Sequence, residues 1–201
     1  MHGASEDTTS SLLERARAAD PEAWRRIVRI YGPLVYGWAR KAGLQPSDAS
    51  DVVQEVFSAA SRYLGRFRKR EPGDSFRGWL WTVCRSKIQD HFRGLVDIPR
   101  AVGGTTANLR IQGLPESPRR DDSEAGRAES RQLGLNALLE YRGSFEPQVW
   151  EAFWRVAVDE RPPADVAREL GVSVWAVYKS KSRVLHRLRR ELDGLIVLEA
   201  S

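Results

Sequence analysis

Apolar residues recur at spacings of three and four along two long stretches of the chain, residues 11–94 and 131–193. This period places apolar side chains on one face of a helix. The alternating pattern typical of strands is nearly absent. The sequence therefore predicts an all-α protein with two small helical domains. We expect the first to be a four-helix bundle and the second to contain a helix-turn-helix.

Residues 95–130 separate the two stretches and contain four Gly and three Pro without a sustained helical pattern. This composition is typical of a flexible linker. Such a linker would let the two helical domains stand apart, so that they need not touch. Residues 1–10 are expected to be a disordered start. Residues 194–201 are expected to be a short tail that leaves no room for a regulatory domain at that end.

Capping and turn residues predict where the helices of the first stretch begin and end. Asp20, which is followed by a proline, is a typical helix start. Gly32 and Pro33 are expected to interrupt that helix, because proline lacks the backbone N–H and clashes with the preceding turn. Ser47 or Asp48 is expected to cap the next long helix.

That next helix has one apolar face and one acidic face. The apolar stripe is Val52, Val53, Val56, Phe57, Ala60, Tyr63 and Leu64. The opposite side carries Asp51, Gln54 and Glu55, and residues 44–57 hold three acidic and no basic side chains. An acidic face suits a positively charged protein partner rather than DNA.

Residues 62–93 have the opposite charge, with nine basic against three acidic side chains. Asp74 or Ser75 is expected to cap a helix in this segment. Its inward residues are predicted to be Phe76, Trp79, Leu80, Val83, Cys84, Ile88, His91 and Phe92, and its outward residues Arg77, Trp81, Arg85, Lys87 and Gln89. A random surface seldom separates the signs so cleanly, and the separation favours a nucleic-acid face.

Composition adds to this picture. The formal net charge is +5, the pI is about 9.6, and only five of the 32 basic residues are Lys. Arg forms forked contacts with phosphate, although a GC-rich genome produces the same bias. The single cysteine, Cys84, cannot form an intramolecular disulfide and is expected to be a buried thiol in a reducing compartment. We expect a cytoplasmic protein without membrane insertion, because neither a signal peptide nor a long apolar run is present.

Residues 162–190 predict the helix-turn-helix. Ala167 lies on the inner face of a short helix, Gly171 permits the left-handed turn that ends it, and Ser173 can cap the next helix. The buried side of that second helix is predicted to be Val174, Val177, Val184, Leu185 and Leu188.

The opposite face of this second helix is basic, with six basic and no acidic side chains in residues 173–190. Its first turns would enter the major groove of DNA. The candidate base contacts are Trp175, Ala176 and Lys179, the candidate phosphate contacts are Arg183 and Arg187, and Ser173 and Ser182 complete the face. A merely solvated basic face is the alternative that the residues leave open.

Two motifs resemble a known family. The stretch DASDVVQEVFSAASRYLGRFR, followed by SFRGWLWTVCRSKIQDHFR, resembles region 2 of the extracytoplasmic-function (ECF) sigma factors, the two-domain branch of the sigma-70 family. The stretch VYKSKSRVLHRLRREL resembles their region 4. The resemblance implies region 2 at residues 11–94 and region 4 at residues 131–193. It also implies a non-enzymatic promoter-specificity subunit of bacterial RNA polymerase, without cofactor, metal or small-molecule substrate.

The resemblance also implies roles for particular residues. Asp51, Gln54 and Glu55 would dock on the β′ coiled coil of core RNA polymerase, and region 4 would contact the β flap. The melted −10 element would be held by Arg66, Phe67, Arg68, Lys69, Arg77, Trp81 and Arg85. Region 4 would read the −35 duplex of the promoter DNA. Ser86 departs from the Asn that many relatives carry there. A separate anti-sigma protein is left open as a further partner.

Two other classes of protein compete with this interpretation. A helix-turn-helix regulator that acts without polymerase would explain the second domain but leaves the first unexplained. An enzyme is disfavoured, because His2, His91 and His186 are far apart and no Cys or carboxylate accompanies them at metal-ligand spacing. A phosphate-binding Gly loop is also absent from the sequence.

Overall fold

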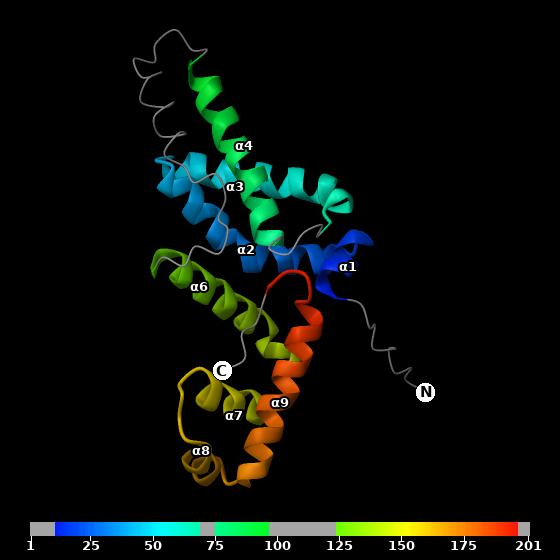
Figure 1. Ribbon diagram of the computed structural model, residues 1–201, viewed down its shortest axis with the longest axis vertical. Helices are drawn as coiled ribbons and strands as arrows, with labels where there is room; N and C mark the ends of the chain where they lie inside the picture. The colour runs from blue at the N-terminus through cyan, green and yellow to red at the C-terminus, as the bar shows by residue number, and fades with distance from the viewer. Residues whose placement is uncertain (1–10, 69–74, 97–123, 197–201) are drawn as a thin grey trace.

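The computed structural model describes residues 11–68, 75–96 and 124–196, and within these ranges the chain forms helices and no strands. Figure 1 shows two groups of helices, one above the other, with α6 between them. In chain order the helices are α1 (Leu12–Arg17), α2 (Pro21–Lys41), α3 (Pro46–Tyr63), the short 3-10 helix η1 (Leu64–Arg66), α4 (Phe76–Val96), α6 (Glu124–Tyr141), the 3-10 helix η2 (Arg142–Ser144), α7 (Pro147–Ala157), α8 (Pro163–Leu170) and α9 (Val174–Glu191). The predicted all-α class is confirmed.

Helix α2 starts as predicted but does not break where predicted. Asp20 caps it by accepting hydrogen bonds from the backbone N–H groups of Glu22 and Ala23, at 2.8 and 3.3 Å. The expected interruption at Gly32 and Pro33 is wrong, because α2 continues through both residues to Lys41. An interior proline costs about 3 kcal/mol. The eight buried residues of α2 outweigh that cost, since burying one large apolar side chain contributes about 1.5 to 3 kcal/mol.

The starts of α3 and α4 differ from each other in their capping. Helix α3 begins at Pro46 after Gln45, which makes no side-chain cap, so neither of the two predicted caps is used. Proline already has the backbone angle of a first helical turn and lacks the N–H that a cap would satisfy. Ser75 does cap α4 by accepting from the N–H of Gly78 at 3.1 Å. Asp74, the alternative cap, lies outside the described residues.

Helices α1 to α4 form a four-helix bundle, as predicted in number, but α1 was not among the predicted helices and α2 replaces two of them. Helix α2 packs on α1, α3 and α4, and α3 packs on α4. Edge-on aromatic contacts fill its interior, among them Tyr31 with Phe76 at 5.1 Å between ring centroids and Trp38 with Trp81 at 5.1 Å. The bundle therefore fixes the outward faces of α3 and α4.

The second group contains the predicted helix-turn-helix, formed by α8 and α9. Gly171 ends α8 with a φ of 66°, the left-handed region, and Ser173 caps α9 by accepting from the N–H of Ala176. Helix α7 packs on both α8 and α9. Val174 was expected on the buried side but is 41% exposed, because it is the first residue of α9, directly after the Ser173 cap.

The two groups are in contact, which corrects the expectation that the domains need not touch. Helix α6 starts at Glu124, seven residues before the predicted start of the second domain, so the predicted linker is shorter at its C-terminal end. Gly126 is buried inside α6, where packing offsets the roughly 1 kcal/mol that a helical glycine costs. The rest of the predicted linker, residues 97–123, lies outside the described residues, as do residues 1–10 and 197–201 of the predicted start and tail.

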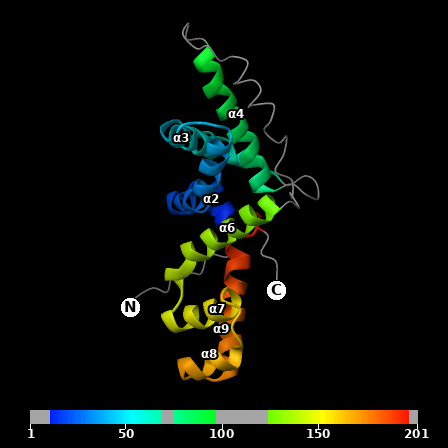
Figure 2. The same cartoon turned by 90° about the vertical axis from the view of Figure 1, so that its left-hand side faces the viewer.

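One continuous core runs through both groups. Helix α6 lies along α2 and contributes Leu133, Ala137 and Tyr141 to the same buried cluster as the bundle (Figure 2). After α9, the chain returns to the bundle, where the buried Tyr31 hydroxyl donates to the carbonyl oxygen of Leu195 at 2.7 Å. A flexible separation of the two domains is thus not the arrangement of this structure.

Candidate functional surfaces

Helix α3 presents Asp51, Gln54 and Glu55 to solvent, and we call these three residues the acidic surface. The i, i+3, i+4 spacing puts them on one side of the helix. Burial of Val52 and Val56 on the other side fixes that orientation. These exposures confirm the acidic face and most of the apolar face predicted for α3, but Tyr63, at the end of the predicted apolar stripe, is 47% exposed.

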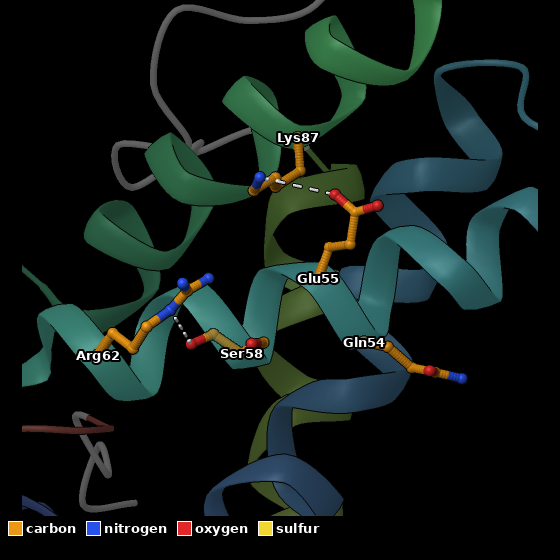
Figure 3. A pocket seen from close by; sticks show the side chains of 5 residues that line it. All are labelled: Gln54, Glu55, Ser58, Arg62 and Lys87. Atoms are coloured by element: carbon orange, nitrogen blue, oxygen red, sulfur yellow. Dashed lines mark hydrogen bonds and ion pairs between the residues drawn. The ribbon is translucent and has the colours of Figure 1, made fainter. Parts of the chain in front are cut away.

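A shallow hollow of about 370 Å³ lies between α3 and α4, beside the acidic surface. Gln54, Glu55, Ser58, Arg62 and Lys87 line it (Figure 3). Glu55 points toward α4, with its Oε2 atom 3.6 Å from Nζ of Lys87, whereas Gln54 points away. The Glu55 side chain remains 58% exposed, so this ion pair is weak and leaves the carboxylate accessible to a partner.

The candidate DNA residues near η1 are held by local contacts. Arg66 stacks over the ring of Tyr63, with 5.3 Å between its Cζ atom and the ring centroid. Arg68 donates to the carbonyl oxygens of Gly65 and Phe67 at 2.6 and 2.9 Å. Both arginines are exposed. Lys69 lies outside the described residues.

The two candidate stacking aromatics are buried. Phe67 is 4% exposed and packs against Phe76 and Trp79, with centroid distances of 5.7 and 5.4 Å. Trp81 is 3% exposed and packs edge-on against Trp38, which corrects its predicted place on the outward face of α4. The physical reason is that α2 covers this part of α4. Stacking on a DNA base would require these rings to be uncovered.

Arg77 and Arg85 lie on α4, and both are partly buried. The Nε atoms of both side chains are buried without a hydrogen-bond partner among the described residues. Arg77 is nevertheless strongly engaged through its terminal nitrogens. Its Nη2 atom lies 2.6 Å from Oε2 of Glu129, and Nη1 donates to Oγ of Ser130 at 2.9 Å.

Further donors converge on the carboxylate of Glu129. We call Glu129 and its partners Trp38, Lys41 and Arg77 the Glu129 site. Nζ of Lys41 lies 2.6 Å from Oε1 of Glu129, and Nε1 of Trp38 donates to Oε2 at 3.3 Å. Burial raises the pKa of the Glu129 carboxyl, but hydrogen bonds from Lys41 and Trp38 and the charges of Lys41 and Arg77 outweigh it and hold that pKa below its ordinary value. The sequence reasoning missed this site, because its members come from α2, α4 and α6.

The first turns of α9 are open to solvent. Trp175 is 69% exposed and Tyr178 is 56% exposed. Nζ of Lys179 lies over the Trp175 ring, 4.8 Å from its centroid. Ala176 is half-buried, while Ser173, Ser182 and Arg183 are exposed.

Arg187 differs from the other candidates on α9. Its guanidinium stacks over Phe145 at 5.5 Å, and Nη1 donates to the carbonyl oxygen of Ser144 at 3.3 Å. These contacts tie it to its own domain, so a phosphate contact would compete with them.

Within residues 11–68, 75–96 and 124–196, no three His, Cys, Asp or Glu side chains are grouped so that they could hold a metal ion. None of the helices in these ranges has the length and apolar character needed to cross a bilayer. Burial raises the pKa of the Cys84 thiol to about 12, so it is not a reactive thiolate at neutral pH.

Two known proteins that are similar to this chain are both named as RNA polymerase sigma factors. The ECF RNA polymerase sigma factor BldN of Streptomyces coelicolor is 27% identical over 90% of this chain, which spans 64% of the length of BldN. The RNA polymerase sigma factor CnrH of Cupriavidus metallidurans is 26% identical over 94% of this chain and 96% of CnrH. Residues 27–96 match the family described as Sigma-70 region 2. The chain belongs to the ECF branch of the sigma-70 family.

Two solved structures are also similar to this sigma factor. CnrH in complex with the cytosolic domain of CnrY has a TM-score of 0.33 at 23% identity, over 90% of this chain and 95% of that chain. The RsbN–BldN complex has a TM-score of 0.34 at 21% identity, over 89% of this chain and 97% of that chain.

The match to Sigma-70 region 2 places several of the surfaces within one family segment. Residues 27–96 contain most of α2 and all of α3, η1 and α4. The acidic surface therefore lies in region 2 of this sigma factor, together with Lys41 and Arg77. Glu129, which engages these two cations, comes from outside the matched segment.

Proposed function

We propose that this sigma factor binds core RNA polymerase and directs promoter-specific transcription initiation. The observation that carries the proposal is the separation of charge on a chain with a sigma-70 region 2. An exposed acidic surface on α3 is distinct from the exposed basic turns of α9 and from the arginines of α4. A protein that only binds DNA has no use for an acidic face, whereas one that also binds a basic protein does.

The acidic surface is the proposed docking site for the β′ coiled coil of polymerase. Asp51 has no ion pair among the described residues, and Glu55 has only the weak pair with Lys87, so both carboxylates can meet a basic partner. Gln54 adds a hydrogen-bonding amide between them. The second domain is proposed to contact the β flap.

The first domain is proposed to hold the melted −10 strand. A single strand is held by cations that follow its backbone and by rings that stack on its bases. The proposed set is Arg66, Phe67, Arg68, Lys69, Arg77, Trp81 and Arg85. Since Phe67 and Trp81 are buried, the proposal requires that strand capture be coupled to a rearrangement around α4.

The second domain is proposed to read the −35 duplex with α9 in the major groove. Trp175, Ala176 and Lys179 stand at the end of α9 that a helix-turn-helix presents to base edges. The remaining proposed contacts are Ser173, Ser182, Arg183 and Arg187. Because the first turns of α9 are exposed, this helix could enter the groove without a rearrangement of the protein.

The domain organisation belongs to the same proposal. We assign region 2 to the helices within residues 11–96 and region 4 to those within residues 124–193. The chain would act in the cytoplasm, where polymerase and promoter DNA are, and a separate anti-sigma protein is included as a further partner. No cofactor, metal or small-molecule substrate enters the proposal, and we assign no catalytic residue.

Run-off transcription with purified core polymerase tests the function directly. Core polymerase with this chain should produce transcripts, from promoters selected out of random DNA, that core polymerase alone does not produce. Identical products with and without the chain on every template would contradict the proposal. A gel shift without polymerase separates the alternative, because a regulator acting alone would bind its operator tightly by itself.

Asp51→Arg tests the docking surface. Reversing a charge opposite a basic partner should cost about 2 to 5 kcal/mol of polymerase binding, which weakens holoenzyme assembly by about thirtyfold or more. Asp159→Arg is the matched control, since Asp159 is an exposed acidic residue beyond the end of α7. If core polymerase retains Asp51→Arg as well as it retains the unaltered chain in a pull-down, the acidic surface is not the docking site.

A further inference from the structure

The Glu129 site has the chemistry of an anion-binding site that the chain itself fills. An ammonium from Lys41, a guanidinium from Arg77 and an indole N–H from Trp38 all point at one carboxylate. We propose that these three side chains form a phosphate-binding site, that Glu129 occupies it while the domains are closed, and that a backbone phosphodiester of single-stranded DNA replaces Glu129 when α6 moves away.

The charge and geometry of the donors favour an anion as the replacement for the carboxylate. Trp38 is 4% exposed, and the Arg77 side chain is 12% exposed. In the closed state the buried donors depend on Glu129 for an acceptor. Departure of α6 would expose the Trp38 N–H and the Arg77 fork to water and would leave Lys41 and Arg77 without their counter-charge. A phosphodiester offers two oxygens and one negative charge, as a carboxylate does, and suits the fork of an arginine.

The surroundings of the site favour nucleic acid as the source of that phosphate. The Trp38 ring, whose N–H bonds Glu129, lies edge-on against Trp81. Cations beside aromatic rings are the usual composition of a single-strand site. Arg77 is also one of the residues proposed above for the −10 element. The inference rests on that proposed function and adds Lys41 and Trp38 to it.

The placement of Glu129 couples strand binding to domain closure. Glu129 lies on α6, which leads into the helix-turn-helix domain, whereas its three partners lie on α2 and α4. A ligand that binds only the open state shifts the equilibrium toward it. Other contacts across the same interface also favour the closed state, among them the bidentate pair in which Nε and Nη2 of Arg29 donate to Oε2 and Oε1 of Glu140. DNA binding and closure are therefore mutually exclusive at this site.

The test is the affinity of the full chain for a short fluorescein-labelled single-stranded DNA, measured by anisotropy without polymerase. Glu129→Gln should bind about two- to fivefold more tightly than the unaltered chain, because loss of the Glu129 ion pairs weakens the closed state by a factor of about this size. Glu169→Gln is the matched control. It removes the same charge from contacts with Arg155 and Arg161, all within the second domain, and should leave the affinity unchanged.

A double variant shows whether the increase in DNA affinity arises at the proposed site. Lys41 is exposed at the end of α2, so Lys41→Gln does not endanger the fold. Adding it to Glu129→Gln should abolish most of the gain in affinity. If the gain persists in full without Lys41, the DNA binds elsewhere and the proposed site is wrong. If Glu129→Gln binds no more tightly than the unaltered chain, Glu129 does not block a DNA site and the inference is also wrong.

Two further measurements separate this inference from its alternatives. Glu129→Gln should raise the affinity for a duplex of the same sequence less than it raises the affinity for the single strand. Inorganic phosphate should displace the labelled single strand no better than chloride of equal ionic strength does. Strong competition by phosphate alone would reassign the site to free phosphate. Run-off transcription reports on the proposed function separately, so transcription that stays intact while Glu129→Gln gains no affinity overturns only this inference.

Discussion

The two basic surfaces of this sigma factor differ in how accessible they are. The first turns of α9 stand open, with Trp175, Tyr178 and Lys179 exposed. The first turn of α4 is covered, because Arg77 is engaged by Glu129 and Ser130 of α6. A duplex can thus reach its proposed site directly, whereas a single strand has to displace part of the protein. This difference fits the order in which a promoter presents the two forms of DNA.

The two surfaces also rest on cores of very different size. Helix α4 belongs to the large buried cluster that runs through both domains. In the part of the chain that the structure describes, the outer end of the helix-turn-helix rests on a cluster of four buried residues, Ala152, Val166, Ala167 and Val177. Because stability follows the apolar area that is buried, we expect the open surface to be the locally less stable one.

The largest expected effect is on this small core. Val177→Asp would bury an unpaired carboxylate in place of a fully buried side chain and should destabilise α8 and the start of α9 by at least about 3 kcal/mol. Hydrogen exchange should lose protection there while α2 and α3 stay protected. Val174→Asp, at an exposed position on the same helix, is the control. Loss of protection throughout the chain would contradict the separation of the two cores.

The contact between the domains can be weakened at Tyr31. Tyr31→Phe removes the buried hydroxyl that donates to Leu195 and leaves that carbonyl without its donor, which should lower the free energy of unfolding by about 1 to 3 kcal/mol. Urea denaturation measures this change. Tyr36→Phe, at an exposed position on the same helix, should change it by less than about 0.5 kcal/mol. Equal effects of the two variants would mean that the Leu195 contact adds nothing to closure.

The open surface can be tested without disturbing the fold. Lys179→Ala should weaken binding of the holoenzyme to its −35 sequence by about 1 to 3 kcal/mol if the contact is to a base edge. Lys181→Ala, two residues away and half-buried off this face, is the control. Competition with altered −35 sequences decides the type of contact, because an equal loss on all sequences would reassign Lys179 to phosphate.

The smallest expected effect is the pH dependence of closure. A lowered pKa means that the ionised Glu129 stabilises the closed state at pH values above the carboxyl's ordinary pKa of 4.5. That contribution, about 1 kcal/mol or less, is lost as the pH falls through the lowered pKa. As the pH falls, the radius of gyration measured by small-angle scattering should therefore rise more in the unaltered chain than in Glu129→Gln. Parallel curves for the two proteins would show that this carboxyl does not control closure.

Local features were predictable from the sequence alone. The cap at Asp20, the left-handed turn at Gly171 and the cap at Ser173 depend on residues within a few positions of each other. The exposed acidic surface followed from the 3.6-residue period of α3 for the same reason. Periodicity and capping act over one or two turns, so a single sequence contains all the information that they need.

Other features depended on residues far apart in the sequence. Pro33 stays helical, and Gly126 lies inside a helix, because packing against other elements outweighs their local preferences. Trp81 is buried by Trp38, although its position on α4 indicated an outward side chain. Local propensity is a weak prior wherever tertiary burial contributes more free energy.

The sequence by itself determined the helical class, the helix-turn-helix and the opposite charges of α3 and α9, since each is encoded in neighbouring residues. Only the tertiary structure decided that the two domains share a core and that Glu129 forms ion pairs with Lys41 and Arg77. These contacts join residues 52 and 88 positions apart. Nothing in the local pattern of charge selects one such pair among the 32 basic and 27 acidic side chains of the chain.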